Sequence, residues 1–270
     1  MGAPLPFTKM VASGNDFVVI DNREGSVRPG LAWVKQLCEA HTGIGADGVL
    51  LLEKSQKSSF KMRIFNSDGS QAEACGNGFR CIAVFAKQKL RLPDAFQFES
   101  RAGLIRARVS GKRVCVELVK PSGYRKGELE VLGRRFRYSF IKTGVPHTVI
   151  FVEGLEKAEV ENLGRAIRHH EDFKPRGTNV NFVEVKGERE IHVRTYERGV
   201  ERETLACGTG STASALVSHL AGYVGAPVCV TTRGGEVLTV NFEKKGDSFS
   251  RVTLEGGAQF VFEGKWANGG

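Results

Sequence analysis

Several features that mark other classes of protein are missing from this sequence of 270 residues. No stretch approaches the roughly 20 continuous apolar residues of a membrane span. Residues 1–17 lack the apolar run and small-residue cleavage site of a signal peptide. There is no C-x-x-C motif and no zinc-finger, RNP or P-loop pattern. We therefore expect a cytoplasmic protein with no membrane partner, no nucleic-acid partner and no bound metal.

The cysteines are few, and the chain does not need them as covalent links. Six are present, and thiols in the cytoplasm stay reduced. A chain of this length, 41% hydrophobic, has enough apolar material for a packed core without disulfides. Four of the six lie in apolar helix or strand patterns, so we expect them to be small buried side chains: Cys38, Cys81, Cys115 and Cys229.

The net charge is +9, from 39 Lys and Arg against 30 Asp and Glu. The basic residues are scattered along the chain rather than clustered, which argues against a nucleic-acid surface. A basic field would also steer a small dicarboxylate toward the protein. A basic anion-binding or nucleic-acid-binding module without turnover remains an alternative to an enzyme.

An internal repeat organises the chain. Cys75 and Cys207 both lie in an ACGxG segment, 132 residues apart. The same offset relates residues 45–47 (GAD) to 177–179 (GTN) and residues 101–103 (RAG) to 233–235 (RGG), while residues 13–20 match 143–150 at an offset of 130. These matches keep the same order in both halves. The spacing is too long for a solenoid, so it indicates one duplicated domain.

Each half shows the same succession of elements. Alternating and apolar patterns predict a strand, a helix, two strands, a helix opened by the ACGxG segment, and two further strands. In the first half these are residues 17–21, 31–41, 49–55, 60–67, 79–90, 103–110 and 113–119, and in the second half 148–153, 157–170, 180–186, 189–198, 211–225, 237–243 and 250–256. The turn cluster 121–123 marks the boundary, so we expect domains at 1–121 and 122–257. The apolar run 259–262 has no place in the second half. We expect 258–264 to complete the first domain's sheet and 265–270 to form an irregular tail.

The predicted fold is therefore α+β, with two duplicated domains. Each would be a mostly antiparallel sheet or barrel around a central helix. A duplication places equivalent residues about a pseudo-twofold axis, so we expect the active site in the cleft between the domains.

Two cysteines in this arrangement suit proton transfer. Each would precede a helix, where unpaired N–H groups and the helix dipole favour a thiolate and hold an anion. A substrate carboxylate bound there would place its α-carbon between two sulfur atoms. One thiolate would remove a proton from one face and the opposite thiol would return a proton to the other, which inverts the stereocentre.

At this point the motifs resemble those of a known family. The segments SGNDFVVIDN, GIGADGVLLLE, FNSDGSQAEACGNGFRC, GVPHTVIF, GTNVNF and YERGVERETLACGTGS are similar to those of diaminopimelate epimerases, in order and across nearly the whole chain. The resemblance implies a homodimer of two-domain chains. It also implies interconversion of LL- and meso-diaminopimelate without pyridoxal phosphate or any other cofactor, as a step of lysine and peptidoglycan precursor synthesis.

The resemblance also assigns roles by position. Cys75 and Cys207 match the catalytic cysteines, while His147 and Glu197 match residues that tune the pKa of the thiols. The matching substrate-binding residues are Asn15, Asn66, Gly76, Asn77, Asn179, Glu197, Arg198, Gly208 and Thr209. The chemistry of these side chains agrees, because Arg198 suits a bidentate carboxylate contact and the Asn amides offer donors and acceptors to an amino-acid group.

Other interpretations accompany these assignments. Asn15, Asn66 and Asn179 could be turn residues, and His147 a structural histidine. For Asp16, Asp47 and Asp68 we favour turn or capping roles, and for Glu203 a loop or helix-entry carboxylate. Val145 departs from the Asn that many family members have before the Pro-His pair, and Gly48 departs from the Gln that some members have. A related racemase of the proline or hydroxyproline type is the alternative enzyme.

Overall fold

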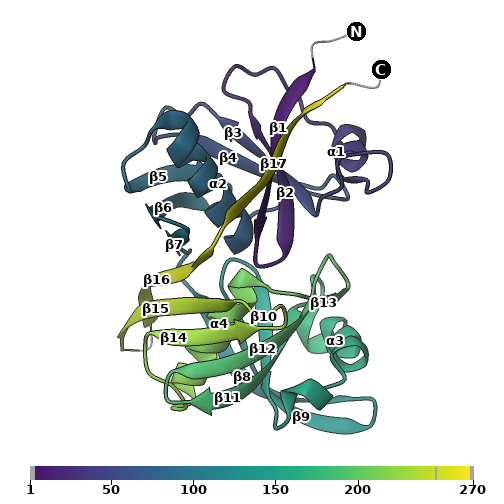
Figure 1. Cartoon of the computed structure of the whole chain (residues 1–270). Coiled ribbons are helices and arrows are strands. Elements are labelled where there is room, and N and C mark those ends of the chain that lie inside the picture. The colour runs from purple at the N-terminus through teal and green to yellow at the C-terminus, as the bar shows by residue number, and fades with distance from the viewer. Residues whose placement is uncertain (1–3, 247, 268–270) are drawn as a thin grey trace. The chain divides into compact units, whose positions relative to one another are not determined.

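A computed structural model describes residues 4–246 and 248–267 of the chain. The chain divides into two compact units (Figure 1). Unit 1 consists of Met1–Val116 and Gly256–Gly270, and unit 2 consists of Glu117–Glu255. None of the described helices is long and apolar enough to cross a membrane.

Unit 1 is one sheet with two helices. Its strands pair in the order β17-β1-β2-β3-β4-β5-β6-β7, and only the pairs β2–β3 and β4–β5 are parallel. The elements are β1 (Leu5–Ala12), β2 (Asn15–Asp21), α1 (Leu31–Cys38), β3 (Gly48–Glu53), β4 (Lys61–Asn66), α2 (Gly76–Leu90), β5 (Ala95–Ser100), β6 (Gly103–Ser110), β7 (Arg113–Glu117) and β17 (Gln259–Trp266).

Unit 2 repeats that arrangement. Its strands pair in the order β8-β9-β10-β11-β12-β14-β15-β16, again with two parallel pairs, β10–β11 and β12–β14. The elements are β8 (Ser122–Val131), β9 (Arg134–Lys142), β10 (Pro146–Phe151), α3 (Val160–Arg168), β11 (Asn179–Gly187), β12 (Glu190–Glu197), β13 (Arg202–Thr204), α4 (Gly208–Leu220), β14 (Val228–Thr232), β15 (Val237–Lys245) and β16 (Ser248–Gly257), with short 3-10 turns at Leu155–Lys157 and Glu171–Phe173.

The return of the C-terminal strand is confirmed. β17 pairs antiparallel with β1, from Leu5 opposite Trp266 to Val11 opposite Gln259, and so takes the edge position that β8 takes in unit 2. The predicted irregular tail is wrong at its start, because Lys265 and Trp266 belong to β17. Residues 268–270 of that tail lie outside the described residues.

A central helix in each unit is also confirmed. All residues from Gly76 to Ala86 of α2 and from Gly208 to Ser218 of α4 are buried. The opposite face of each sheet carries another helix. In unit 1, α1 packs Val34 and Leu37 against Val18, Ile20 and neighbouring strand residues. In unit 2, α3 packs Val160, Leu163 and Ile167 in the same way against Ile150, Val180 and Phe182.

Strand alternation then decides which residues reach the central helix. Because neighbouring residues of a strand point to opposite faces, Phe17 and Leu50 lie on the α2 side when Val18 and Leu51 face α1. A Cβ built on Gly78 of α2 would lie 3.3 Å from Leu50 Cδ2 and 3.1 Å from Ile64 Cδ1. Phe17, Leu50 and Ile64 therefore form what we call the α2-facing layer.

The strand registers correct the alignment of the two halves by one residue. Phe17 pairs with Gly48 and Leu50 with Ile64, just as His147 pairs with Asn179 and Asn181 with Thr195. Gly48, not Asp47, is thus equivalent to Asn179, because the pairing relates the two halves here by an offset of 131 residues instead of 132. Equivalent positions below are defined by this pairing, and in α2 and α4 by the two cysteines. The α4-facing layer is therefore His147, Asn181 and Thr195.

Several strands do not appear among the predicted elements: β1, β5, β8, β9, β13 and β14. The expectation for the four structural cysteines is correct for Cys38 and Cys81, which are buried, but wrong for Cys229, which is exposed. Cys229 lies on the outward side of β14, where burial alternates along the strand. Cys115 is half-buried.

Candidate active site

Both cysteines of the repeated motif lie directly before a central helix. Cys75 is the N-cap residue of α2 and Cys207 the N-cap residue of α4, each with extended backbone angles (φ −150° and −123°). The first N–H groups of each helix therefore point toward its cysteine end, where the helix dipole is positive. This is the placement that the motif predicts, and it holds in each unit separately.

Cys75 contacts an acceptor as well as a backbone donor. Its Sγ accepts from the Gly78 N–H at 3.4 Å and lies 3.8 Å from Asn15 Oδ1. Asn15 donates its Nδ2 to the Asp47 carboxylate at 2.7 Å, and a carboxylate can only accept. The amide of Asn15 is therefore oriented with its oxygen toward Cys75.

Asp16, at the start of β2, and Asp47, directly before β3, hold these two segments together. The Asp47 N–H donates to Asp16 Oδ1 at 3.0 Å, the Asp16 N–H donates to Asp47 Oδ2 at 3.2 Å, and Lys9 pairs with Asp16 at 2.7 Å. Asp68 accepts from the N–H and hydroxyl of Ser70 at 2.8 and 2.6 Å, which lowers the pKa of the Asp68 carboxyl below its ordinary value. Asp68 therefore has the turn role that we favoured from the sequence, whereas Asp16 and Asp47 link the start of β2 to the residue before β3.

Cys207 lies at the end of a buried polar chain. Its Sγ is 3.6 Å from the hydroxyl oxygen of Thr209, which is 3.0 Å from Nε2 of His147. Nδ1 of His147 is 3.2 Å from Nδ2 of Asn181. Cys207 is 6% exposed and His147 and Asn181 are 0% exposed, so water competes little for these contacts.

His147 is uncharged in this setting. Burial, with the positive charge of Arg198 adding to the effect, lowers the pKa of its imidazole from the ordinary 6.5 to about 3. A neutral imidazole has one N–H and one acceptor nitrogen. The contact of this neutral ring nearest to Cys207 is with the hydroxyl of Thr209.

The other predicted residues of unit 2 lie at the end of β12 and in β11. Asn179 donates to the Pro146 carbonyl at 2.8 Å and accepts from the Arg198 N–H at 2.9 Å, so its amide holds the start of the Glu197–Arg198 turn. Glu197 accepts from the Thr204 hydroxyl at 2.9 Å. Arg198 donates to the Arg176 carbonyl at 3.4 Å.

In unit 1, Asn77 and Asn66 have different surroundings. Asn77 is buried, and its Oδ1 accepts from Arg80 at 3.0 Å. Arg80, 0% exposed, also donates to Ser13 and to the Gly257 carbonyl. Asn66 is exposed, and its amide donates to Ser70 Oγ at 2.9 Å. Gly48 leaves no room for a side chain, since an added Cβ would lie 2.5 Å from the Phe65 carbonyl oxygen.

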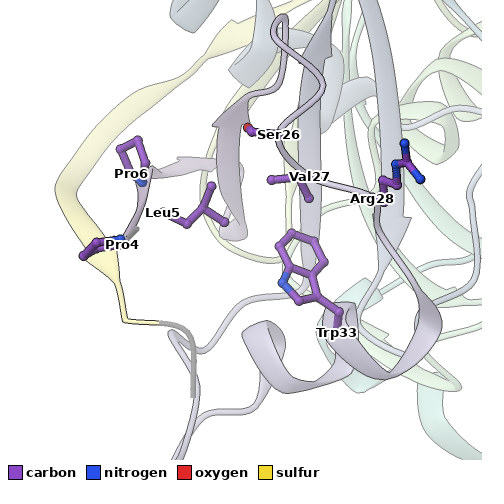
Figure 2. A pocket seen from close by; sticks show the side chains of 7 residues that line it. All are labelled: Pro4, Leu5, Pro6, Ser26, Val27, Arg28 and Trp33. Carbon is purple, nitrogen blue, oxygen red and sulfur yellow. The ribbon is translucent and has the colours of Figure 1, made fainter. Parts of the chain in front are cut away.

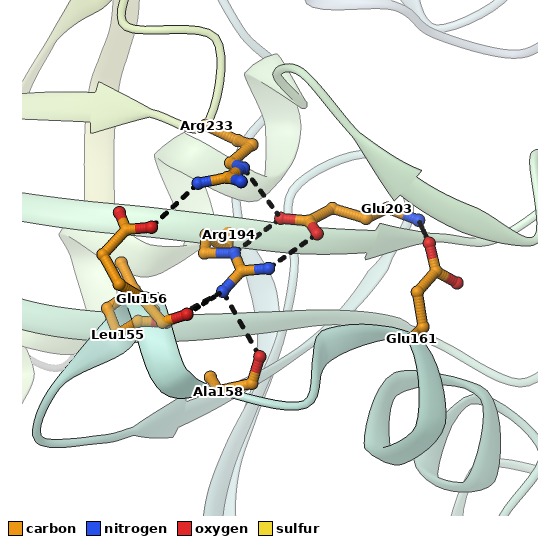
Figure 3. Close-up of polar contacts among 7 residues, drawn as sticks. All are labelled: Leu155, Glu156, Ala158, Glu161, Arg194, Glu203 and Arg233. Carbon is orange, nitrogen blue, oxygen red and sulfur yellow. Dashed lines mark hydrogen bonds and ion pairs between the residues drawn. The ribbon is translucent and has the colours of Figure 1, made fainter.

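Glu203 has a role that the sequence interpretation missed. It lies in β13, and both of its carboxylate oxygens accept from Arg194, at 2.6 and 2.8 Å (Figure 3). The third nitrogen of that guanidinium reaches the carbonyls of Leu155, Glu156 and Ala158. Glu203 is thus a structural ion-pair partner that clamps the strand leading to Cys207, not a helix-entry carboxylate.

The structure therefore groups the predicted residues by unit. Unit 1 holds Asn15 against Cys75, and unit 2 holds His147 and Thr209 in a chain with Cys207. Three buried residues that the structure places beside them are not among the predicted site residues: Asn181, Arg194 and Arg80. The i, i+2 spacing of Asn179 and Asn181 on a buried strand was a signal for Asn181, because two amides on one face of a strand need partners.

A pocket of about 320 Å³ lies elsewhere in unit 1 (Figure 2). It is lined by Pro4, Leu5, Pro6, Ser26, Val27, Arg28 and Trp33, none of which is a predicted site residue. In the part of the chain that the structure describes, no three His, Cys, Asp or Glu side chains gather in a group that could hold a metal ion.

Comparison with known proteins gives a consistent match over nearly the whole chain. A family model described as diaminopimelate epimerase matches residues 7–121 and 139–261. A diaminopimelate epimerase of Aquifex aeolicus is 48% identical over 274 residues, covering 97% of this chain and 97% of the relative. One from Archaeoglobus fulgidus is 41% identical, covering 96% of this chain and 95% of the relative.

Solved structures show the same fold at low sequence identity. A hydroxyproline epimerase from Agrobacterium vitis has a TM-score of 0.74 and 16% identity, over 98% of this chain and 92% of the other. A Bacillus anthracis protein of the phenazine biosynthesis PhzF family has a TM-score of 0.74 and 14% identity, over 98% of this chain and 100% of the other.

Proposed function

The chain belongs to the diaminopimelate epimerase family, and from that premise we propose that it interconverts LL-2,6-diaminopimelate and meso-diaminopimelate by carrying protons on the thiols of Cys75 and Cys207. It is an isomerase, and the step belongs to lysine biosynthesis and to the supply of peptidoglycan precursors. The observation that carries the two-thiol mechanism is the repeated placement of a cysteine directly before each central helix.

The first half of the reaction removes the α-proton. A thiolate on one cysteine takes the hydrogen of the substrate α-carbon, and the C–H electron pair moves into the carboxylate as an enediolate. The first N–H groups of the neighbouring helix are donors that stabilise this charge, and they act most strongly where water is excluded. Gly76 and Gly208 allow a carboxylate to approach the helix backbone closely, because they have no Cβ.

The second half returns a proton to the opposite face. The other cysteine must then be a thiol, whose proton goes to the α-carbon while the electron pair returns from the carboxylate, and the stereocentre is inverted. Two groups in opposite protonation states are required. The reaction in the reverse direction begins with the protonation states exchanged.

The distal end of diaminopimelate carries a second amino-acid group. We propose that Asn15, Asn66, Asn77, Asn179, Glu197, Arg198 and Thr209 bind the two ends of the substrate. What supports this is their chemistry: amide donors and acceptors for an amino-acid group, and in Arg198 a guanidinium for a carboxylate. Asn179 would act by holding the Arg198 backbone.

The test is exchange of the α-hydrogen in deuterated water. With LL-diaminopimelate as substrate, we expect deuterium at one α-carbon together with formation of the meso isomer, followed by NMR and chiral chromatography. Cys75→Ser and Cys207→Ser should each lower the rate of epimerisation by about 10²–10⁴-fold, since each removes the proton carrier of one face.

Cys229→Ser is the matched control, because Cys229 is exposed on β14 of unit 2 and should keep full activity. Full activity in both Cys75→Ser and Cys207→Ser would reject the two-thiol mechanism. Turnover of proline or trans-4-hydroxyproline in place of diaminopimelate would favour the racemase alternative and reject the proposed substrate.

We further propose that the protein works as a cytoplasmic homodimer. The resemblance of its motifs to those of the family supports this proposal. Light scattering coupled to size-exclusion chromatography would test the oligomeric state, and a mass of 29.5 kDa, that of one chain, would reject the dimer.

A further inference from the structure

We propose that Asn181 is a positioning residue that sets the tautomer of His147 and thereby directs the hydrogen bonds of the buried chain toward the sulfur of Cys207. This proposal rests on the proposed role of Cys207 as a proton carrier. It concerns residues of unit 2 alone and gives a role to a buried amide that the reaction itself does not touch.

The orientation of the Asn181 amide is determined by a backbone carbonyl. Its Nδ2 lies 3.1 Å from the Thr148 carbonyl oxygen, and its Oδ1 lies 3.0 Å from the Thr195 hydroxyl. A carbonyl oxygen only accepts hydrogen bonds, so the amide nitrogen must be the group that faces it. The reversed amide would place two acceptors against each other in a site that is 0% exposed.

The same nitrogen faces the imidazole. Nδ2 of Asn181 is 3.2 Å from Nδ1 of His147, and its second hydrogen is left for this contact once the first goes to Thr148. An amide nitrogen is only a donor, so Nδ1 must be the unprotonated nitrogen of the ring. The single hydrogen of the neutral imidazole is therefore on Nε2.

This tautomer decides what Thr209 offers to Cys207. Nε2–H of His147 donates to the Thr209 hydroxyl oxygen at 3.0 Å. The hydroxyl hydrogen is then not needed by the ring and can point to Cys207 Sγ at 3.6 Å. All donors in the chain run from Asn181 toward the sulfur, and a donor favours the thiolate. The opposite tautomer would draw the hydroxyl hydrogen to the ring and leave an acceptor facing the sulfur.

The equivalent positions of unit 1 carry no such chain. Leu50 stands where unit 2 has Asn181, and Phe17 stands where it has His147. Both are buried apolar side chains. The duplicated fold therefore does not require this series of hydrogen-bonded side chains, because it forms with either set of residues.

The direct test is NMR of the wild-type protein labelled with ¹⁵N-histidine. The two ring nitrogens of His147, assigned by the signals missing from His147→Gln, should show an unprotonated Nδ1 and a protonated Nε2 across neutral pH. A protonated Nδ1 in the wild type would overturn the proposal, whether or not any variant folds.

Asn181→Asp tests the consequence for the thiol. An ionised carboxylate only accepts, so His147 should move its hydrogen to Nδ1 and Nε2 should take the Thr209 hydroxyl hydrogen. In the Cys75→Ser background, the pH midpoint of iodoacetamide alkylation of Cys207, read by peptide mass spectrometry, should rise by about one unit. The thiolate population below the midpoint would then fall about tenfold.

Asn241→Asp adds the same charge on an exposed position of β15 and should leave the tautomer and the alkylation midpoint unchanged. If Asn181→Asp lowers only the melting temperature while the tautomer and midpoint stay as in the wild type, Asn181 is merely structural. If Asn181→Asp does not fold, Asn181→Leu takes its place as the test variant, since it introduces the residue found at this position in unit 1. His147 should then lose its preference for the Nε2–H tautomer. Failure of epimerisation in the wild type would reject the proposed function and leave these readouts unaffected.

Discussion

The two central helices of this protein pack against strands of opposite character. Under α2 lie Phe17, Leu50 and Ile64, whereas the equivalent positions under α4 carry His147, Asn181 and Thr195. The strand order and the parallel and antiparallel pairs are the same in both units. The backbone arrangement thus depends on strand pairing and on the apolar face under α1 and α3, while the layer under the central helix can be apolar or polar.

The difference extends to the two cysteines. Cys75 Sγ faces the amide oxygen of Asn15, and Cys207 Sγ faces a threonine hydroxyl backed by His147. A buried polar layer has to be fully hydrogen-bonded to be tolerated. The α4-facing layer meets that condition through contacts among its own members and with Thr209 of α4. We infer that the buried polar groups of unit 2, which are unfavourable for folding by themselves, are present because they place a hydroxyl beside Cys207 Sγ.

The largest expected effect concerns two equivalent arginines on β12 and β4. Arg194 is held by both oxygens of Glu203 and by three carbonyls, whereas Arg63 makes one ion pair with Glu53 at 3.4 Å. Arg194→Met should lower the free energy of unfolding by about 3 kcal/mol, because it leaves the half-buried Glu203 carboxylate without its main partner and three carbonyls without a donor. Urea titration followed by far-UV circular dichroism measures this.

Arg63→Met is the matched variant, and it should cost at most about 1 kcal/mol, since its ion pair is partly exposed. Equal losses for the two variants would show that both arginines contribute the same amount to the free energy of unfolding. The two units would then not differ at this position. The cost for Arg194→Met should persist at high salt, because buried pairs are screened little.

The next effect compares the second glycines of the two motifs. A Cβ on Gly210 would lie 2.4 Å from Asn181 Oδ1 and 3.3 Å from Cys207 Sγ, whereas one on Gly78 would meet the flexible ends of Ile64, Leu50 and Met62 at 3.1–3.3 Å. Gly210→Ala should cost about 1–3 kcal/mol by overpacking and should lower kcat/KM as well. Gly78→Ala should be close to neutral, since alanine favours the helix by about 1 kcal/mol.

Thermal unfolding and steady-state epimerisation of both variants measure this pair. If Gly78→Ala were the more harmful change, the apolar layer would be the less adaptable of the two. That result would contradict the view that Asn181 is held rigidly by its three hydrogen bonds.

A smaller effect concerns acid stability. The folded pKa of His147, about 3, lies below its ordinary 6.5, so between these pH values the unfolded chain binds a proton that the folded one does not. The free energy of unfolding therefore falls as the pH decreases through this window. His147→Phe, which copies Phe17, should remove this contribution, about 2 kcal/mol between pH 7 and pH 5.

The measurement is the slope of unfolding free energy against pH for the wild type and for His147→Phe. The variant is expected to be less stable at pH 7, because Thr209 and Asn181 lose a partner, but its stability should depend less on pH. Identical slopes would mean that the folded protein protonates His147 as readily as the unfolded chain does.

Much of this arrangement follows from local sequence, and the rest depends on tertiary partners. The Gly-rich segments after Cys75 and Cys207 predict helix starts because they are followed by long apolar helical patterns. β8 and β9 are not predicted, since β8 is exposed along most of its length and lacks the alternation that marks a half-buried strand. β13 is three residues long and leaves no periodic signal at all.

The hydrogen-bonded side chains that lead to Cys207 are likewise only partly predictable from local sequence. The motifs single out Cys207, Thr209 and His147, but only the parallel pairing of β10 with β11 brings Asn181 beside His147. Glu203 is likewise a loop carboxylate by sequence, and its ion pair with Arg194 depends on the pairing of β13 with β12. Contacts between neighbouring strands are non-local, and neither composition nor periodicity encodes them.

The smallest expected effect concerns a buried hydroxyl of α4 that is not hydrogen-bonded to the polar side chains around that helix. Ser218 Oγ is buried, and it has no hydrogen-bond partner among the described residues, while the equivalent residue of α2 is Ala86. Since an unpaired buried hydroxyl is unfavourable, Ser218→Ala should raise the free energy of unfolding by up to about 1 kcal/mol. Thr143→Val, which removes a buried hydroxyl that donates to the Thr209 carbonyl at 2.9 Å, should lower it by about 1 kcal/mol. Urea titrations of both variants measure these changes. A clear loss of unfolding free energy in Ser218→Ala would mean that a buried water is hydrogen-bonded to the hydroxyl. The polar layer under α4 would then extend along the whole helix.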